Sequence, residues 1–200
     1  MDSLRTLFTR ISEGCRSLLN RLCLLSLLPC LCNAHAETGE RLTLCIDFGC
    51  KHEQTVLIDG IALQGVEATL KKAATAEEER LAVGLAIGRI ERLAGQRSPI
   101  RHDRARNARV GEPGQLDCIA ESRNTRRILG LLMDRRLLRW HLPRERVRRA
   151  PWLFDIHWAA SLQETRSGKY WVVDSWFRDN GEPAVVQSLS AWRKGEPFEQ

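Results

Sequence analysis

The feature that most restricts the fold is a pair of alternating apolar segments in the C-terminal part of the chain. Residues 156–162 read Ile-His-Trp-Ala-Ala-Ser-Leu, and residues 170–175 read Tyr-Trp-Val-Val-Asp-Ser. The turn-forming sequence Glu-Thr-Arg-Ser-Gly at 164–168 separates them. Alternation with a period of two is typical of strands that lie against a core, and the turn between them predicts an antiparallel hairpin.

This hairpin predicts that His157 and Asp174 lie on the same face of the sheet. A turn centred near Thr165 and Arg166 pairs residues whose numbers add up to 331, so that His157 faces Asp174. A register moved by two residues keeps both side chains on one face, because side chains alternate along a strand. The opposite face of the first strand then carries Ile156, Trp158, Ala160 and Leu162.

The segment 75–94 is predicted to be a helix, since Thr75 and Glu78 form a capping box and Gly95 follows as a helix-ending residue. Gly84 and Gly88 provide a flat strip for close packing. The apolar positions at helical spacing, which are expected on the buried face, are Leu81, Leu85, Ile90 and Leu93. The charged positions 77–80 and 91–92 are expected on the solvent-facing side.

A polar, Gly- and Pro-containing stretch at 96–114 predicts a loop, and a second helix then runs to about Met133. Cys118 lies in the first turn of this helix. A helix start presents free backbone N–H groups and the positive end of the helix dipole, which favour a thiolate and an oxyanion. The residues on the same face as Cys118 are Ser122, Thr125, Leu129 and Leu132.

These segments together predict a catalytic triad. A thiol nucleophile needs a base and a group that orients the base. Cys118 supplies the thiol, His157 supplies the imidazole on a neighbouring strand, and the Asp174 carboxylate holds the second ring nitrogen. Each residue also has an ordinary structural interpretation, as a core cysteine, a hydrogen-bonded histidine and a turn acid.

Residues 1–36 have the organisation of a secretory signal peptide. Four arginines precede or border the apolar run Leu22–Cys32, which is short for a membrane span of about 20 residues. The small residues of Ala34-His35-Ala36 predict cleavage before Glu37. The prediction is a periplasmic or secreted protein with one domain at 37–200 and no transmembrane span after cleavage. An uncleaved N-terminal anchor is the alternative.

The composition, 43% hydrophobic over 200 residues, supplies a core for one domain and excludes a disordered or fibrous chain. Removal of the signal peptide lowers the net charge from +6 to +4 and leaves Cys45, Cys50 and Cys118. Cys45 and Cys50 flank a turn-like insert. In an exported protein they form either a local disulfide or two free thiols, whereas a metal site is disfavoured because no second ligand pair matches them.

The chain resembles the transglutaminase-like cysteine peptidase superfamily, in particular its bacterial branch with papain-like topology. The residues that carry this resemblance are Asp117-Cys118 at a helix start, His157-Trp-Ala before an alternating strand, and Trp171-Val-Val-Asp174-Ser-Trp. The resemblance covers residues 110–180 well, and residues 37–110 loosely through the helix that contains Glu79 and Arg80.

This resemblance implies an α+β fold in which the nucleophile helix packs on an antiparallel sheet. It also implies acyl transfer through a thioester, as peptide or amide hydrolysis or as transamidation of a peptide or protein substrate. Cys118 is then the nucleophile, His157 the general base and acid, and Asp174 the orienting group. Papain-like enzymes use a glutamine upstream of the cysteine as an oxyanion donor. Gln115 is therefore a candidate for that role, with packing of the loop as the alternative.

Two other functions remain open from the sequence. The region 123–149 holds ten arginines, which is typical of a basic surface, but no base-reading motif accompanies them. An anionic envelope surface, or a plain solvated face, fits an exported protein better than nucleic acid does. The second alternative is an exported interaction domain that kept the fold and lost catalysis. We infer no cofactor, since no phosphate-binding glycine loop, nicotinamide motif or zinc-ligand set occurs.

Three tryptophans, Trp158, Trp171 and Trp176, are expected to flank the site. Trp176 or Trp140 is a candidate to line a groove.

Overall fold

The computed structural model describes residues 39–107, 110–150 and 156–198, which belong to one unit spanning Glu37–Gln200. The predicted signal peptide at 1–36 lies outside these residues. Among the described segments, no helix combines the length and apolar character of a membrane span.

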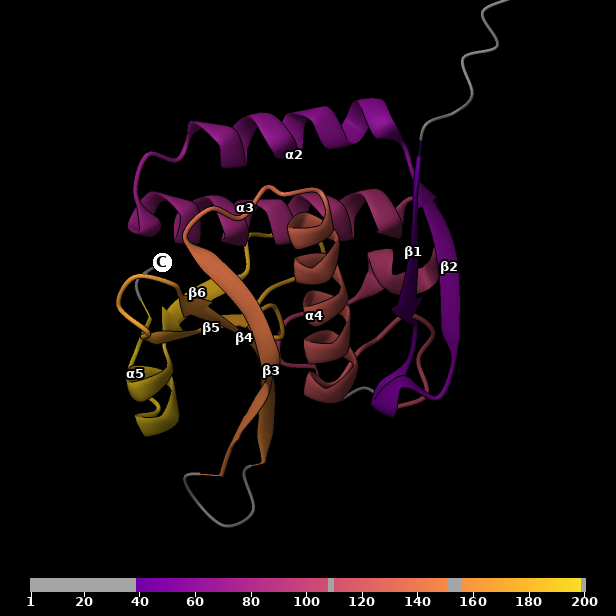
Figure 1. The fold of residues 1–200 in the computed structure, drawn as a ribbon. Coiled ribbons are helices and arrows are strands. Elements are labelled where there is room, and N and C mark those ends of the chain that lie inside the picture. The colour runs from indigo at the N-terminus through magenta and orange to yellow at the C-terminus, as the bar shows by residue number, and fades with distance from the viewer. Residues whose placement is uncertain (1–38, 108–109, 151–155, 199–200) are drawn as a thin grey trace, which may run out of the picture. The chain divides into compact units, whose positions relative to one another are not determined.

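The chain forms α-helices and two antiparallel sheets, which confirms the α+β class (Figure 1). The smaller sheet pairs β1 (Glu40–Cys45) with β2 (Glu53–Ile58), and the larger sheet has the order β3-β4-β5-β6. The strands of the larger sheet are β3 (His141–Arg149), β4 (His157–Glu164), β5 (Tyr170–Asp174) and β6 (Val185–Ser188). The helices are α2 (Gly60–Lys72), α3 (Ala76–Gly95), α4 (Cys118–Asp134) and α5 (Leu189–Lys194), with 3-10 turns at Phe48–Cys50 and Pro99–His102.

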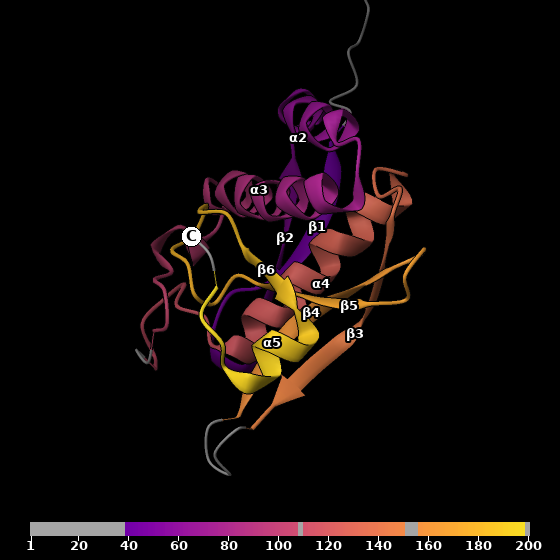
Figure 2. The same cartoon turned by 90° about the vertical axis from the view of Figure 1, so that its left-hand side faces the viewer.

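Helix α4 lies at the centre of the fold, between the small hairpin and the larger sheet. It packs against β3 and β4 on one side and against β1 on the other. The buried apolar residues of α4 join one core with residues from both sheets: Ile128, Leu129 and Leu132 from α4, Leu42 and Leu44 from β1, and Ala160, Leu162 and Val173 from the larger sheet. Helix α5 and Trp192 cover the other face of that sheet, where Ala159 and Val172 are buried (Figure 2).

The predicted hairpin forms, but its register differs from the predicted one by two residues. Ala160 lies opposite Val173, so paired residue numbers add up to 333 instead of 331. The cause is the loop after Glu164, in which Gly168 takes a left-handed conformation (φ 70°) and the pairing closes between Glu164 and Lys169. Because the difference is an even number of residues, His157 and Asp174 remain on one face.

Helix α3 begins where the capping residues predict, with the Thr75 hydroxyl accepting a hydrogen bond from the Glu78 N–H. The predicted orientation of the helix is only partly right: Ile90 is buried and Arg92 is exposed as predicted, but four other positions differ. Leu81 and Leu85 are 68% and 50% exposed, whereas Glu79 and Glu91 are buried. The buried face consists mainly of small and β-branched residues: Ala82, Val83, Gly84, Ala86, Ile87, Gly88, Ile90 and Ala94.

The two glycines of α3 do provide the predicted surface for close packing. The segment 182–184 crosses the helix at Gly84 and Gly88, and the Ala184 N–H donates to the Gly84 carbonyl oxygen (3.1 Å). A methyl group at Gly88 would collide with the carbonyl of Glu182. This close approach is possible only because Gly84 and Gly88 carry no side chain. It holds the segment between β5 and β6 against α3.

Several elements lacked a recognisable sequence signal. Helix α2 starts at Asp59, whose carboxylate accepts from the N–H groups of Ile61 and Ala62. Strand β3 occupies a stretch that the sequence presents only as basic. Its register against β4 is interrupted between Arg144 and Val147, and the Ser161 hydroxyl donates to the Glu145 carbonyl within this irregularity.

Candidate functional site

The ends of β4 and β5 place His157 and Asp174 in direct contact. His157 Nε2 lies 2.8 Å from Asp174 Oδ2, and the two residues are only 3% and 2% exposed. Burial disfavours the protonated form of His157, but the hydrogen bonds and charges of Asp174 and Cys118 outweigh burial and raise the pKa of His157 to about 9. Imidazolium is thus the resting form of His157 at neutral pH.

Cys118 is the first residue of α4 and the only cysteine outside a disulfide in the described part of the chain. Its thiol points toward the Ile156 carbonyl oxygen at 4.0 Å, directly beside His157. Since Nε2 of His157 faces Asp174, Nδ1 is the ring nitrogen left to exchange a proton with this thiol. The sequence-predicted residues Cys118, His157 and Asp174 are therefore brought together from one helix start and two strand ends.

The start of α4 also supplies backbone donors. Asp117 caps the helix by accepting from the Ala120 N–H (2.9 Å). In the described residues, no acceptor is recorded for the N–H groups of Cys118 and Ile119, which are the first two of the helix. In an α-helix such N–H groups are directed along the axis toward the N-terminal end, which here carries Cys118. An oxyanion formed on a bound carbonyl would need hydrogen-bond donors at this place.

Trp192, which the sequence analysis did not single out, is a further member of the site. Its indole Nε1–H donates to Asp174 Oδ2 at 2.8 Å, the same oxygen that faces His157. Its ring centroid lies 5.6 Å from that of His157, and the side chain is 1% exposed. Trp192 thereby fixes the orientation of the carboxylate from the α5 side of the sheet.

A buried polar network joins the first turn of α4 to the end of β5. The Ser175 hydroxyl donates to Glu121 Oε2 (2.5 Å) and lies 2.8 Å from the Thr125 hydroxyl. Glu121 is one turn after Cys118, and Ser175 directly follows Asp174. This network therefore holds the helix that carries Cys118 against the strand that carries Asp174.

Three buried carboxyl groups, those of Glu91, Asp103 and Glu121, lie around this network. Burial raises the pKa of each, and repulsion from Glu121 contributes to the rise at Asp103, whose pKa reaches about 10. Asp103 Oδ1 accepts from the Leu116 N–H at 2.7 Å, which ties the approach to α4 to the same network. Asp103 thus carries a proton at neutral pH, and burial together with the repulsion between neighbouring carboxylates favours the protonated form of all three groups.

The side chain of Gln115 forms its hydrogen bonds within the loop that precedes α4. Its Oε1 accepts from Asn107 Nδ2 (2.6 Å), and its Nε2 donates to the His102 carbonyl oxygen. The side chain is 3% exposed, and the hydrogen bonds recorded for it do not join it to Cys118. These contacts correspond to the loop-packing alternative for this residue.

Cys45 and Cys50 form a disulfide across the 3-10 turn at Phe48–Cys50. Glu53 lies close enough to join them as a metal-ligand group, but the disulfide uses both thiols. Helix α4 lies against this turn, and Arg123 Nη1 donates to the Gly49 carbonyl oxygen (3.5 Å). The disulfide therefore braces the turn against which the first half of α4 packs.

The tryptophans expected near the site divide between two roles. Trp176 lies 4.7 Å from the His157 ring and lines a cavity beside it. Trp158, Trp171 and Trp140 instead stack under the guanidinium groups of Arg146, Arg80 and Arg139, respectively. Arg146 also approaches Cys118. Burial and the charge of Arg123 lower the pKa of Arg146, while the charge of Cys118 acts in the opposite direction.

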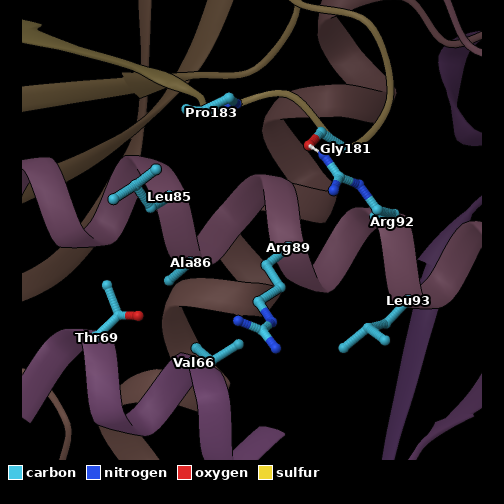
Figure 3. A pocket seen from close by; sticks show the side chains of 9 residues that line it. All are labelled: Val66, Thr69, Leu85, Ala86, Arg89, Arg92, Leu93, Gly181 and Pro183. Carbon is cyan, nitrogen blue, oxygen red and sulfur yellow. Dashed lines mark hydrogen bonds between the residues drawn. The ribbon is translucent and has the colours of Figure 1, made fainter. Parts of the chain in front are cut away.

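A second cavity, of about 430 Å³, opens between α2 and α3 (Figure 3). Arg89 extends from α3 toward Val66 on α2, and Arg92 Nη2 donates to the Gly181 carbonyl (2.5 Å). None of Cys118, His157 and Asp174 lines this cavity. The cavity beside His157, of about 360 Å³, is instead lined by His157 itself and by Trp176, and it adjoins the site.

Comparison of the chain with models of known families, with curated proteins and with solved structures gives no match.

Proposed function

We propose that this protein is a thiol-dependent acyl-transfer enzyme in which Cys118, His157 and Asp174 form the catalytic triad. The observation that carries the proposal is the buried His157–Asp174 pair (2.8 Å) beside a thiol at a helix start. The resemblance to transglutaminase-like cysteine peptidases, with their papain-like topology, assigns the same three roles. The signal-like sequence at 1–36 supports action outside the cytoplasm.

The first half-reaction uses the imidazolium form of His157. The Cys118 thiolate attacks the carbonyl carbon of a peptide or side-chain amide, and the N–H groups at the start of α4 stabilise the oxyanion. As the C–N bond breaks, His157 donates its Nδ1 proton to the leaving nitrogen. An amine departs and the acyl group stays on Cys118 as a thioester.

The second half-reaction restores the enzyme. Neutral His157 takes a proton from water, or from an amine, while that nucleophile attacks the thioester carbonyl. The C–S bond then breaks to release an acid or a new amide, and Cys118 and His157 return to their starting charges. Throughout, Asp174 and Trp192 hold the imidazole in one orientation through Nε2, so that Nδ1 stays directed at the reacting atoms.

The experiment that tests this proposal is acylation by p-nitrophenyl acetate, followed by release of nitrophenolate and by intact mass. We expect a stoichiometric burst and one acetyl group on Cys118. The burst should be lost in Cys118→Ala and slowed at least tenfold in His157→Ala. Acceleration of acyl release by methylamine indicates transamidation, and release by water alone indicates hydrolysis. Acetylation no faster than that of glutathione, and independent of His157, identifies a non-catalytic interaction domain instead.

A further inference from the structure

The cavity beside His157 has the chemistry of a carboxylate-binding site. We refer to it as the arginine pocket, because Arg106 and Arg149 line it together with the aromatic residues Trp176, Phe177 and Phe198. The aromatic rings hold the guanidinium groups in place: Arg106 lies 5.0 Å and Arg149 5.9 Å from the centre of the Phe177 ring. Arg178 lies 5.6 Å from the Phe198 ring, so three cations surround one aromatic pair.

Among the residues that the structure describes, no carboxylate neutralises the arginines of this pocket. In the described part of the chain, none of Arg106, Arg149 and Arg178 forms an ion pair with a carboxylate. Glu196 is the acidic side chain that lines the pocket, and it pairs with Lys194 at 3.3 Å. A ligand with negative charge would therefore meet cations whose charge is still available.

The side chain of Arg149 and the backbone of Arg106 are also held by contacts at the pocket. Arg149 Nη1 donates to the Trp192 carbonyl (2.5 Å), and its Nε is buried with no partner among the described residues. Arg106 takes a left-handed backbone conformation (φ 51°), which costs energy for a residue with a side chain, and its N–H donates to the Trp176 carbonyl (2.8 Å). Backbone strain and unpaired buried donors are typical of sites organised for a ligand.

The position of the pocket relates it to one side of the substrate. Its lining includes His157 but not Cys118. During acylation His157 gives a proton to the leaving nitrogen, so the part of the substrate that follows the scissile amide must pass along His157. The arginine pocket therefore faces the leaving group, and not the acyl group that remains on Cys118.

From these observations we infer that the enzyme selects substrates with a carboxylate on the leaving-group side of the scissile amide. This inference rests on the proposed acyl-transfer function. The carboxylate comes either from an acidic side chain next to the scissile bond or from the free C-terminus of the substrate, because both present the same planar anion to a guanidinium group.

The test is protection of Cys118 against iodoacetamide by small peptides added to the full-length protein. Alkylation is followed on the peptide that contains Cys118 by mass analysis, because residues 1–36 hold four further cysteines. The acidic side chain is represented by Ac-Ala-Ala-Glu-NH₂ against Ac-Ala-Ala-Gln-NH₂. The free terminus is represented by Ac-Ala-Ala-Ala-OH against Ac-Ala-Ala-Ala-NH₂. We expect at least one carboxylate peptide to protect at a concentration about tenfold lower than its neutral partner, and the pair that shows the difference identifies the source.

Arg149→Gln should remove that difference, and Arg106→Gln should reduce it. Arg106 is exposed, so its replacement leaves the packing intact. Arg166→Gln is the matched control, since Arg166 is an exposed arginine in the loop at the opposite end of the β4–β5 hairpin. It should leave the difference unchanged. The alkylation rate without peptide reports whether each variant keeps an intact site.

Equal protection by charged and neutral peptides, absence of protection by all four, or a preference that survives Arg149→Gln would overturn the inference. Those results leave the acyl-transfer proposal standing if alkylation still depends on His157. Loss of the dependence on His157 would refute the acyl-transfer proposal itself, and with it the assignment of the pocket to a leaving group.

Discussion

Raising the pH should remove a defined part of the folding free energy through His157. The pKa of His157 is 6.5 in an unfolded chain and about 9 in the folded protein, so the folded state binds this proton more tightly. The resulting stabilisation is fully present below pH 6.5 and is lost as the pH rises through 9. The difference between these two pKa values corresponds to a folding free energy of about 3 kcal/mol, at about 1.4 kcal/mol per pH unit.

The matched variant is His157→Gln, because glutamine can still donate to Asp174 but does not titrate. The free energy of unfolding is measured by urea titration of both proteins between about pH 6 and pH 10. Glu91, Asp103 and Glu121 also lower stability as the pH rises, since burial raises their pKa values, but they are present in both proteins. The stability difference between the two proteins therefore reports His157 together with its interactions with Asp174 and Cys118.

We expect the wild-type protein to lose about 3 kcal/mol relative to His157→Gln across this range. The difference should be steepest between pH 6.5 and 9. If the two stability curves run parallel, within about 0.5 kcal/mol, then Asp174 and Cys118 do not hold a proton on His157 and the account of the resting site is wrong.

Three further predictions concern the supports of the site. Trp192→Phe keeps the ring but removes the donor to Asp174, and it should lower the free energy of unfolding by about 2 kcal/mol and reduce the burst with p-nitrophenyl acetate. Replacing Cys45 and Cys50 by serine should cost about 2 kcal/mol in urea unfolding, as expected for a short closed loop. Gly88→Ala should lower the melting temperature through an overpacking cost of about 1 to 3 kcal/mol, and an unchanged melting temperature would contradict the close approach of segment 182–184.

The parts of the fold that were predictable carry strong local signals. Thr75 caps α3, Asp117 and Cys118 open α4, and alternation defines β4 and β5. The same alternation predicted correctly that His157 and Asp174 lie on one face of the sheet, although the predicted register was wrong. A register error of an even number of residues does not change the face on which a side chain lies. The loop length, set by the left-handed Gly168, was not readable from turn composition alone.

What the sequence did not reveal depends on partners far along the chain. Glu79 looked like a solvated residue, yet its carboxylate is buried against His141 (2.8 Å) and the N–H groups of Arg139 and Trp140. The role of Trp192 likewise becomes visible only through its hydrogen bond to Asp174, which joins helix α5 to strand β5. Neither position carries a local pattern that distinguishes it from an ordinary charged or apolar residue.

The most direct test of the triad is the rate of Cys118 alkylation by iodoacetamide as a function of pH. The wild-type protein should react well below pH 8, with a rate that falls when His157 is changed to alanine. Within residues 37–200, mass analysis of the peptides should place the modification on Cys118 alone. A rate that follows the profile of a free cysteine peptide, and that His157→Ala leaves unchanged, would contradict the catalytic interpretation.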